Sequence, residues 1–196
     1  MDLSDRFDMV VLIGGVSHTG KTHLAQRLLE KYKIPYLSLD HLKMGLIRGK
    51  IPIGFSQSDS DRKISEVMWP LVEGIIRTTI ENHQHLIIEG CYLPPKSVKR
   101  LKKEYVHDIL ECFLGFTEKY ITENFNSQIL PFRNVIENRK FPEYRSIQEF
   151  VAEHDMMRTA CRINEMNFFD VNEAYEDTVQ EVLDFLHDKL AETSSR

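Results

Sequence analysis

Short apolar segments alternate with longer amphipathic segments along the chain. The apolar segments are rich in β-branched residues and predict five strands, at residues 9–14, 36–39, 85–89, 108–115 and 167–170. Nearly continuous apolar strands are typical of a parallel sheet whose two faces are both covered. The pattern therefore predicts an α/β fold in which helices pack on both faces of a parallel sheet.

The segments between these strands have helical periodicity. The longest places its apolar residues at spacings of three and four, and Pro70 is expected to bend it. The predicted helices are residues 21–32, 59–82, 96–105, 117–129, 147–163 and 174–190. Residues 131–146 follow no clear period and contain two prolines and three arginines, which predicts a mobile segment.

A glycine-bounded motif, GGVSHTGKT, lies between the first predicted strand and the first predicted helix. It contains the pattern G-x-x-x-x-G-K-T, which is specific for a phosphate-binding loop in this context. Backbone N–H groups of such a loop and the positive end of the following helix together bind phosphate oxygens. The residues expected to bind the nucleotide are Gly15, Val16, Ser17, His18, Thr19, Gly20, Lys21 and Thr22.

The loop predicts MgATP as its ligand. Lys21 is expected to reach the β- and γ-phosphates, and the Thr22 hydroxyl is expected to coordinate Mg²⁺. His18 is interpreted as a solvent-facing residue, because the loop binds phosphate through its backbone.

The other strands indicate which class of nucleotide-binding protein this is. The sequence contains neither the D-x-x-G nor the N-K-x-D motif of a GTPase. The third strand ends in Glu89-Gly90 instead of the Asp-Glu pair that a mechanical ATPase uses to polarise water. Both observations favour a transferase over a hydrolase.

Two acids stand at the predicted carboxyl ends of strands, where ligands of open α/β sheets bind. Asp40 is expected to orient an acceptor hydroxyl and to take its proton, with a helix cap as the alternative. Glu89 is expected to lie near Mg²⁺ or the acceptor, because an unpaired buried acid is unfavourable. A structural ion pair is the alternative for Glu89.

Arginines provide the remaining candidate groups. Arg48 follows Asp40 closely enough to bind an anionic group of the acceptor, although an exposed surface position is equally compatible. Residues 131–146 are interpreted as a lid, since phosphoryl transfer requires the exclusion of water and cations near the transferred group. Arg139 and Arg158 are the arginines chosen for that role, with surface ion pairs as the alternative.

Composition limits the remaining possibilities. The 196 residues fit a single domain spanning 1–196, and the net charge of −5 argues against a nucleic-acid-binding surface. Three widely spaced cysteines favour reduced thiols and a cytoplasmic location. The acidic N-terminus and short apolar segments predict neither a signal peptide nor a membrane anchor.

With the phosphate loop, YLSLDHLKMGLIRG and LIIEGCYLPP, the chain resembles small P-loop kinases of the adenylate kinase-like group, most of all 2-phosphoglycerate kinase-type proteins. Asp40, Arg48, Glu89, Gly90 and Pro94 match that type, and the match covers about the first half of the chain. The resemblance implies the three-layer P-loop nucleoside triphosphate hydrolase fold, a sheet order of 2-3-1-4-5, and ATP with Mg²⁺ as phosphoryl donor. It does not fix the acceptor.

Taken together, these features predict an ATP-dependent kinase that transfers the γ-phosphoryl group to a hydroxyl or phosphate of a small metabolite. A nucleoside or nucleoside monophosphate kinase is the alternative among enzymes. A regulatory protein that binds ATP without transferring phosphate is the alternative from another class. The sequence leaves the oligomeric state open.

Overall fold

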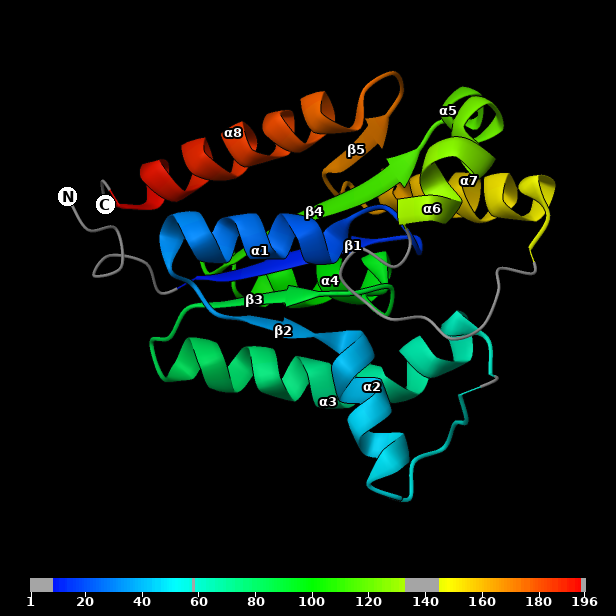
Figure 1. The fold of residues 1–196 in the computed structure, drawn as a ribbon. Coiled ribbons are helices and arrows are strands. Elements are labelled where there is room, and N and C mark those ends of the chain that lie inside the picture. The colour runs from blue at the N-terminus through cyan, green and yellow to red at the C-terminus, as the bar shows by residue number, and fades with distance from the viewer. Residues whose placement is uncertain (1–8, 58, 133–144, 195–196) are drawn as a thin grey trace.

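The fold is a parallel sheet of five strands in the order β2-β3-β1-β4-β5 (Figure 1). The computed structural model describes residues 9–57, 59–132 and 145–194. The strands are β1 (Val10–Gly15), β2 (Tyr36–Ser38), β3 (Leu86–Glu89), β4 (Ile109–Phe116) and β5 (Phe168–Val171). The predicted α/β class, the parallel pairing and the strand order are all confirmed.

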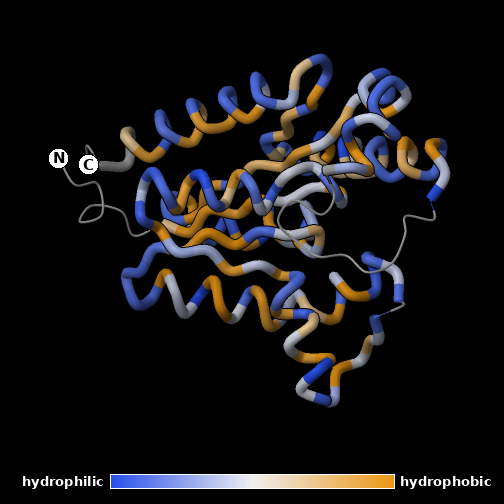
Figure 2. The backbone as a smooth tube through the Cα atoms, in the orientation of Figure 1, coloured by the Kyte–Doolittle hydropathy of each residue, from blue (hydrophilic) through white to orange (hydrophobic). Residues whose placement is uncertain are grey.

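Alternate residues of the central strand β1 enter two different cores. Val10 and Leu12 pack with α3 (Asp61–Glu81), α4 (Pro95–Glu104) and part of α7 (Ile147–Ile163). Val11 and Ile13 face α1 (Lys21–Tyr32) and α8 (Tyr175–Ser194). Figure 1 shows α1 and α8 on one side of the sheet and α3 on the other, and Figure 2 shows the hydrophobic strands between them. Burial on both faces explains the nearly unbroken apolar strands.

A third core fills the end of the sheet beyond β4 and β5. It is covered by α5 (Glu118–Asn124), the π-helix η2 (Phe125–Ile129) and α7. The sequence predicts one helix over residues 117–129, whereas the structure has two helical forms in succession, followed by α6 (Leu130–Phe132). Hydrophobic periodicity cannot separate an α-helix from a short π-helical turn, since the apolar positions remain similar.

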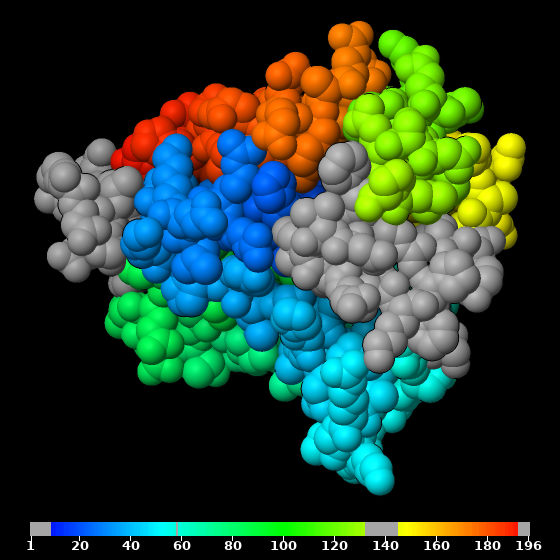
Figure 3. All heavy atoms as spheres, in the orientation of Figure 1, coloured from blue at the N-terminus to red at the C-terminus, as the bar shows by residue number. Residues whose placement is uncertain are grey.

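The second strand ends earlier than predicted. Ser38 pairs with Glu89, the last residue of β3, so no ladder partner follows it. Helix α2 (Leu39–Arg48) starts at the next residue, with Ser38 as an extended N-cap. Asp40 therefore occupies the first turn of a helix instead of a strand end. Helix α2 and its connection to α3 project from the rest of the molecule (Figure 3).

Most of the predicted lid, residues 133–144, lies outside the described residues. The structure describes its first residues within α6 and its last two, Arg145 and Ser146, before α7. Ser146 caps α7 by accepting from the Glu149 amide, and Glu149 in turn accepts from the Ser146 amide. Among residues 9–57, 59–132 and 145–194, no helix has the length and apolar character needed to span a bilayer.

Candidate active site

The phosphate loop has three residues with left-handed or otherwise positive φ angles. These are Gly15 at 130°, His18 at 69° and Gly20 at 76°. Such conformations turn successive N–H groups toward one side and create an anion-binding concavity. A Cβ atom at Gly15 would stand 2.2 Å from the Leu114 carbonyl oxygen, so only glycine fits between the loop and β4.

Helix α1 begins directly at the end of this loop. Gly20 is its N-cap and provides no side-chain acceptor, and the first turn contains no acid. The first N–H groups of the helix and its dipole therefore favour an anion at this end. The φ angle of 76° at Gly20 favours glycine here too, and the Tyr175 hydroxyl occupies the space that a Cβ atom would take.

Lys21 is held inside the loop. Its side chain is buried, and Nζ donates to the Val16 carbonyl oxygen at 2.6 Å and to Thr19 Oγ1 at 3.4 Å. Thr19 Oγ1 also donates to the Val16 carbonyl at 2.9 Å. The ammonium is thus kept at the loop, where it adds positive charge to the concavity.

The two predicted metal-binding residues come from α1 and from the end of β3. Thr22 is the second residue of α1, and Glu89 pairs in register with Ile13 on β1. Alternation along β3 directs the buried Glu89 side chain toward the face covered by α1. Within the described residues no three His, Cys, Asp or Glu side chains form a metal cluster. One hydroxyl and one carboxylate nevertheless suit Mg²⁺, which usually retains several waters and binds substrate phosphates.

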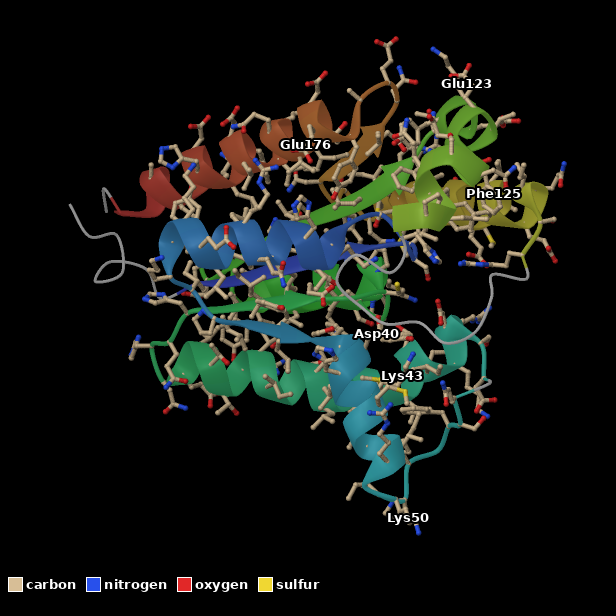
Figure 4. The ribbon with its side chains drawn as sticks, viewed as in Figure 1. Asp40, Lys43, Lys50, Glu123, Phe125 and Glu176 are labelled. Atoms are coloured by element: carbon tan, nitrogen blue, oxygen red, sulfur yellow. The ribbon has the colours of Figure 1, made fainter. Side chains whose placement is uncertain are left out.

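Asp40 belongs to a polar cluster at the start of α2. The Tyr92 hydroxyl donates to Asp40 Oδ1 at 3.2 Å, and Lys43 Nζ lies 3.0 Å from the same oxygen. Lys43 also donates to the Tyr92 hydroxyl and lies 4.8 Å from the centroid of its ring. Figure 4 shows Asp40 and Lys43 on successive turns of α2. Sequence reasoning did not identify Lys43 or Tyr92, although the spacing of Asp40 and Lys43 allows a pair on one helix face.

Cys91 connects this cluster to the phosphate loop. Its Sγ lies 3.7 Å from Ser17 Oγ in the loop, and Tyr92 is the next residue. Burial raises the pKa of the Cys91 thiol, the positive charge of Lys21 lowers it, and the negative charge of Asp40 raises it. The charges of both Lys21 and Asp40 therefore act on the thiol.

Arg48 does not lie beside Asp40 in the structure. The two residues are eight positions apart on one helix, which separates them by about 12 Å along its axis. Arg48 is exposed near the outer end of α2, and Figure 4 shows Lys50 at the tip of this projection. This position favours the surface alternative over a shared acceptor pocket.

Arg158 is engaged in a structural ion pair. Its Nε and Nη2 donate to the two carboxylate oxygens of Asp170, each at 2.7 Å, and Nη2 also donates to the Phe116 carbonyl at 3.0 Å. Nη1 pairs with Asp155. The hydrogen bonds that the guanidinium donates to Asp170 raise the pKa of Arg158. These contacts favour the ion-pair alternative that the sequence left open for Arg158.

Arg139, the other arginine chosen from the sequence, lies outside the described residues. The structure instead brings Arg145 to the phosphate loop, where its Nη2 lies 3.4 Å from His18 Nδ1. Arg145 and His18 are 127 residues apart, so spacing gives no signal for this contact.

The comparisons with known proteins agree with this architecture. No protein-family model and no curated protein matches the sequence. A gluconokinase from Sinorhizobium meliloti 1021 matches 97% of this chain and 95% of its own, with 16% identity and a TM-score of 0.55.

Two further solved structures are similar to the chain over most of its length. A sugar kinase from Janibacter sp. HTCC2649 matches 91% of this chain and 94% of its own, with 14% identity and a TM-score of 0.52. A shikimate kinase from Aquifex aeolicus vf5 matches 92% and 97%, with 14% identity and a TM-score of 0.51. The chain therefore has the three-layer α/β fold that these small P-loop kinases share.

Proposed function

We propose that the protein is an ATP-dependent kinase that transfers the γ-phosphoryl group of MgATP to a small-molecule acceptor. The proposal rests on a short series of contacts that joins the phosphate loop to Asp40. The phosphate loop contacts Cys91 through Ser17, and the adjoining Tyr92 donates to Asp40. A protein that only bound ATP would not require a carboxylate connected to the loop through these contacts.

Each group has a role that follows from its position. Lys21 and the loop amides bind the phosphates, while Thr22 and Glu89 would hold Mg²⁺, which neutralises charge on the phosphates when it is bound. Asp40 orients the acceptor hydroxyl and accepts its proton. Lys43 and Tyr92 fix the Asp40 carboxylate in one orientation, so less of its freedom is lost when the acceptor binds.

A screen of candidate small molecules would identify the acceptor. The names of the structural neighbours place gluconate and shikimate on the panel, and the sequence resemblance adds 2-phosphoglycerate. Nucleosides and nucleoside monophosphates test the alternative kinase class. Formation of ADP that depends on one of these acceptors would support transfer, and binding of MgATP without such dependence would support a regulatory protein instead.

The Lys21→Ala variant tests the donor side. Because Lys21 supplies charge at the phosphates, we expect acceptor-dependent ADP formation to fall by about 100-fold or more. The matched control is Lys31→Ala, which removes an exposed lysine from the other end of the same helix. Circular dichroism establishes that both variants fold. Full turnover in a folded Lys21→Ala variant would contradict the proposal.

A further inference from the structure

Four side chains from two distant parts of the chain meet beside the phosphate loop. His18 comes from the loop, and Arg145, Phe150 and Glu153 come from the start of α7 and the residues before it. The Arg145 guanidinium lies 4.8 Å from the centroid of the Phe150 ring and forms an ion pair with Glu153. Its Nη2 faces His18 Nδ1 at 3.4 Å, and the His18 ring lies 5.9 Å from the Phe150 ring.

The position of His18 in the loop places this cluster near the phosphates. Lys21 Nζ is bonded to Val16 and Thr19, and His18 belongs to the same arc of the loop. The buried His154 ring lies 4.8 Å from the same Phe150 ring, and its pKa is lowered by burial and by the nearby charges of Lys21, Arg145 and His18. These groups therefore converge on one region, which is the region where Lys21 meets the β- and γ-phosphates in loops of this kind.

The contacts of Arg145 differ from those of Arg158. Arg158 is bound by both oxygens of one carboxylate and by a backbone carbonyl. Arg145 pairs with the single carboxylate of Glu153, and the two side chains are 23% and 37% exposed, similar to 32% and 28% for Arg158 and Asp170. An ion pair that is screened by water contributes little, whereas a guanidinium binds phosphate strongly through two parallel N–H groups. An arriving phosphate therefore competes well with Glu153 for Arg145.

Resting on the proposed kinase function, we propose that His18 is a positioning residue that holds Arg145 beside the phosphate loop, where the guanidinium binds the γ-phosphate. The φ angle of 69° at His18 fixes the direction of the side chain. The fully buried Phe150 ring packs against the guanidinium in a cation–π contact. His18 thus contributes its side chain as well as its backbone.

The test compares MgADP with the Mg²⁺ complex of a non-hydrolysable ATP analogue by isothermal titration calorimetry, using the full chain. The Arg145→Ala variant should bind the ATP analogue about tenfold or more weakly, because a charge-assisted contact to the γ-phosphate is lost. Its affinity for MgADP should change by less than about twofold. Arg62→Ala, which removes an exposed arginine on α3, is the matched control and should alter neither affinity.

The His18 variants separate positioning from general damage to the loop. His18→Ala should weaken binding of the ATP analogue about three- to tenfold and leave MgADP binding unchanged. His18→Asn should restore most of the affinity, because asparagine offers an acceptor near the position of Nδ1 and tolerates positive φ. In the His18→Ala/Arg145→Ala double variant, the loss should be no larger than for Arg145→Ala alone.

The outcomes distinguish this inference from the proposed function. Equal losses for MgADP and the ATP analogue, or independent and additive effects of the two residues, would overturn the role of His18. If the Ala variants fail to fold, Arg145→Lys and His18→Asn give the same comparison with smaller changes. If the wild-type chain binds neither nucleotide, the proposed kinase function fails, and this inference fails with it.

Discussion

At the scale of single residues, the sequence was informative where a motif fixes chemistry and uninformative where contacts are made across the chain. Lys21 lies in the loop as its motif predicts, with Nζ bonded to the Val16 carbonyl. Tyr92 and Arg145 were not chosen, because their partners Asp40 and His18 are 52 and 127 residues away. A tyrosine or an arginine at such a distance has no pattern that reveals its partner before the fold is known.

The Asp40→Asn variant tests the acceptor side at this scale. Asparagine keeps the size of the side chain but cannot take a proton or balance the charge of Lys43, so we expect turnover to fall by about 100-fold or more. Affinity for MgATP should stay within about twofold, since Asp40 does not belong to the phosphate loop. Steady-state turnover and calorimetric binding give the two values.

Asp188→Asn, which changes an exposed acid on α8, is the control for the loss of one negative charge. The role of Asp40 would be wrong if the Asp40→Asn variant lost affinity for MgATP while its turnover at saturating nucleotide stayed unchanged.

At the scale of elements, the alternation of apolar and amphipathic segments was enough to place the strands and most helices. Helices α1 and α7 have the predicted bounds, and each strand differs from its prediction by one residue at one or both ends. Hydrophobic patterning could not find the end of β2, because Leu39, a fully buried apolar residue, suits the end of a strand as well as the first residue of α2. Strand β2 ends at Ser38 because its partner strand β3 ends at Glu89, and the sequence of β2 alone does not contain this information.

The pairing of Arg158 with Asp170 connects α7 to β5, and its removal tests the role of Arg158. Arg158→Met and Asp170→Asn should each lower the free energy of unfolding by about 1–3 kcal/mol, with allowance for partial exposure of the pair. In a chain of this length that lowers the melting temperature by about 2–4 °C for each kcal/mol. Turnover well below the melting temperature should change by less than about threefold.

These two readouts also separate the alternatives that the sequence left open for Arg158. A turnover loss of about 100-fold in Arg158→Met, with an unchanged melting temperature, would show that this arginine stabilises the transferred phosphoryl group after all.

At the scale of the whole molecule, a buried titratable group packs against the third core, beyond β4 and β5. His154 is fully buried between the Phe116 and Phe150 rings, and its Nδ1 accepts a hydrogen bond from the Phe116 amide at 2.9 Å. The imidazole is therefore neutral, with its proton on Nε2. Burial lowers the pKa of His154 to about 3, and the nearby charges of Lys21, Arg158, Arg145 and His18 lower it in the same direction.

This pKa makes the stability of the whole fold depend on pH. Between the unfolded value of 6.5 and the folded value of about 3, the unfolded chain binds a proton at His154 that the folded chain does not. The free energy of unfolding therefore falls by about 1.4 kcal/mol per pH unit below 6.5 from this group alone. In His154→Gln, which keeps an acceptor for the Phe116 amide, this contribution is absent. Urea unfolding at pH 7.5, 6.0 and 5.0 gives the free energy of unfolding of each protein. Between pH 7.5 and pH 5.0, the wild type should lose about 2 kcal/mol more of this free energy than the variant does.

The exposed His107→Gln is the control, and its unfolding should follow that of the wild type at each pH. Comparing the change with pH, and not the absolute stabilities, removes any loss of packing that the His154 substitution causes at every pH. Curves for wild type and His154→Gln that stay parallel from pH 7.5 to 5.0 would mean that His154 takes up a proton in the folded chain. The core next to the phosphate loop would then be open enough to hydrate an imidazolium, and it could not hold Phe150 and Arg145 in one fixed arrangement.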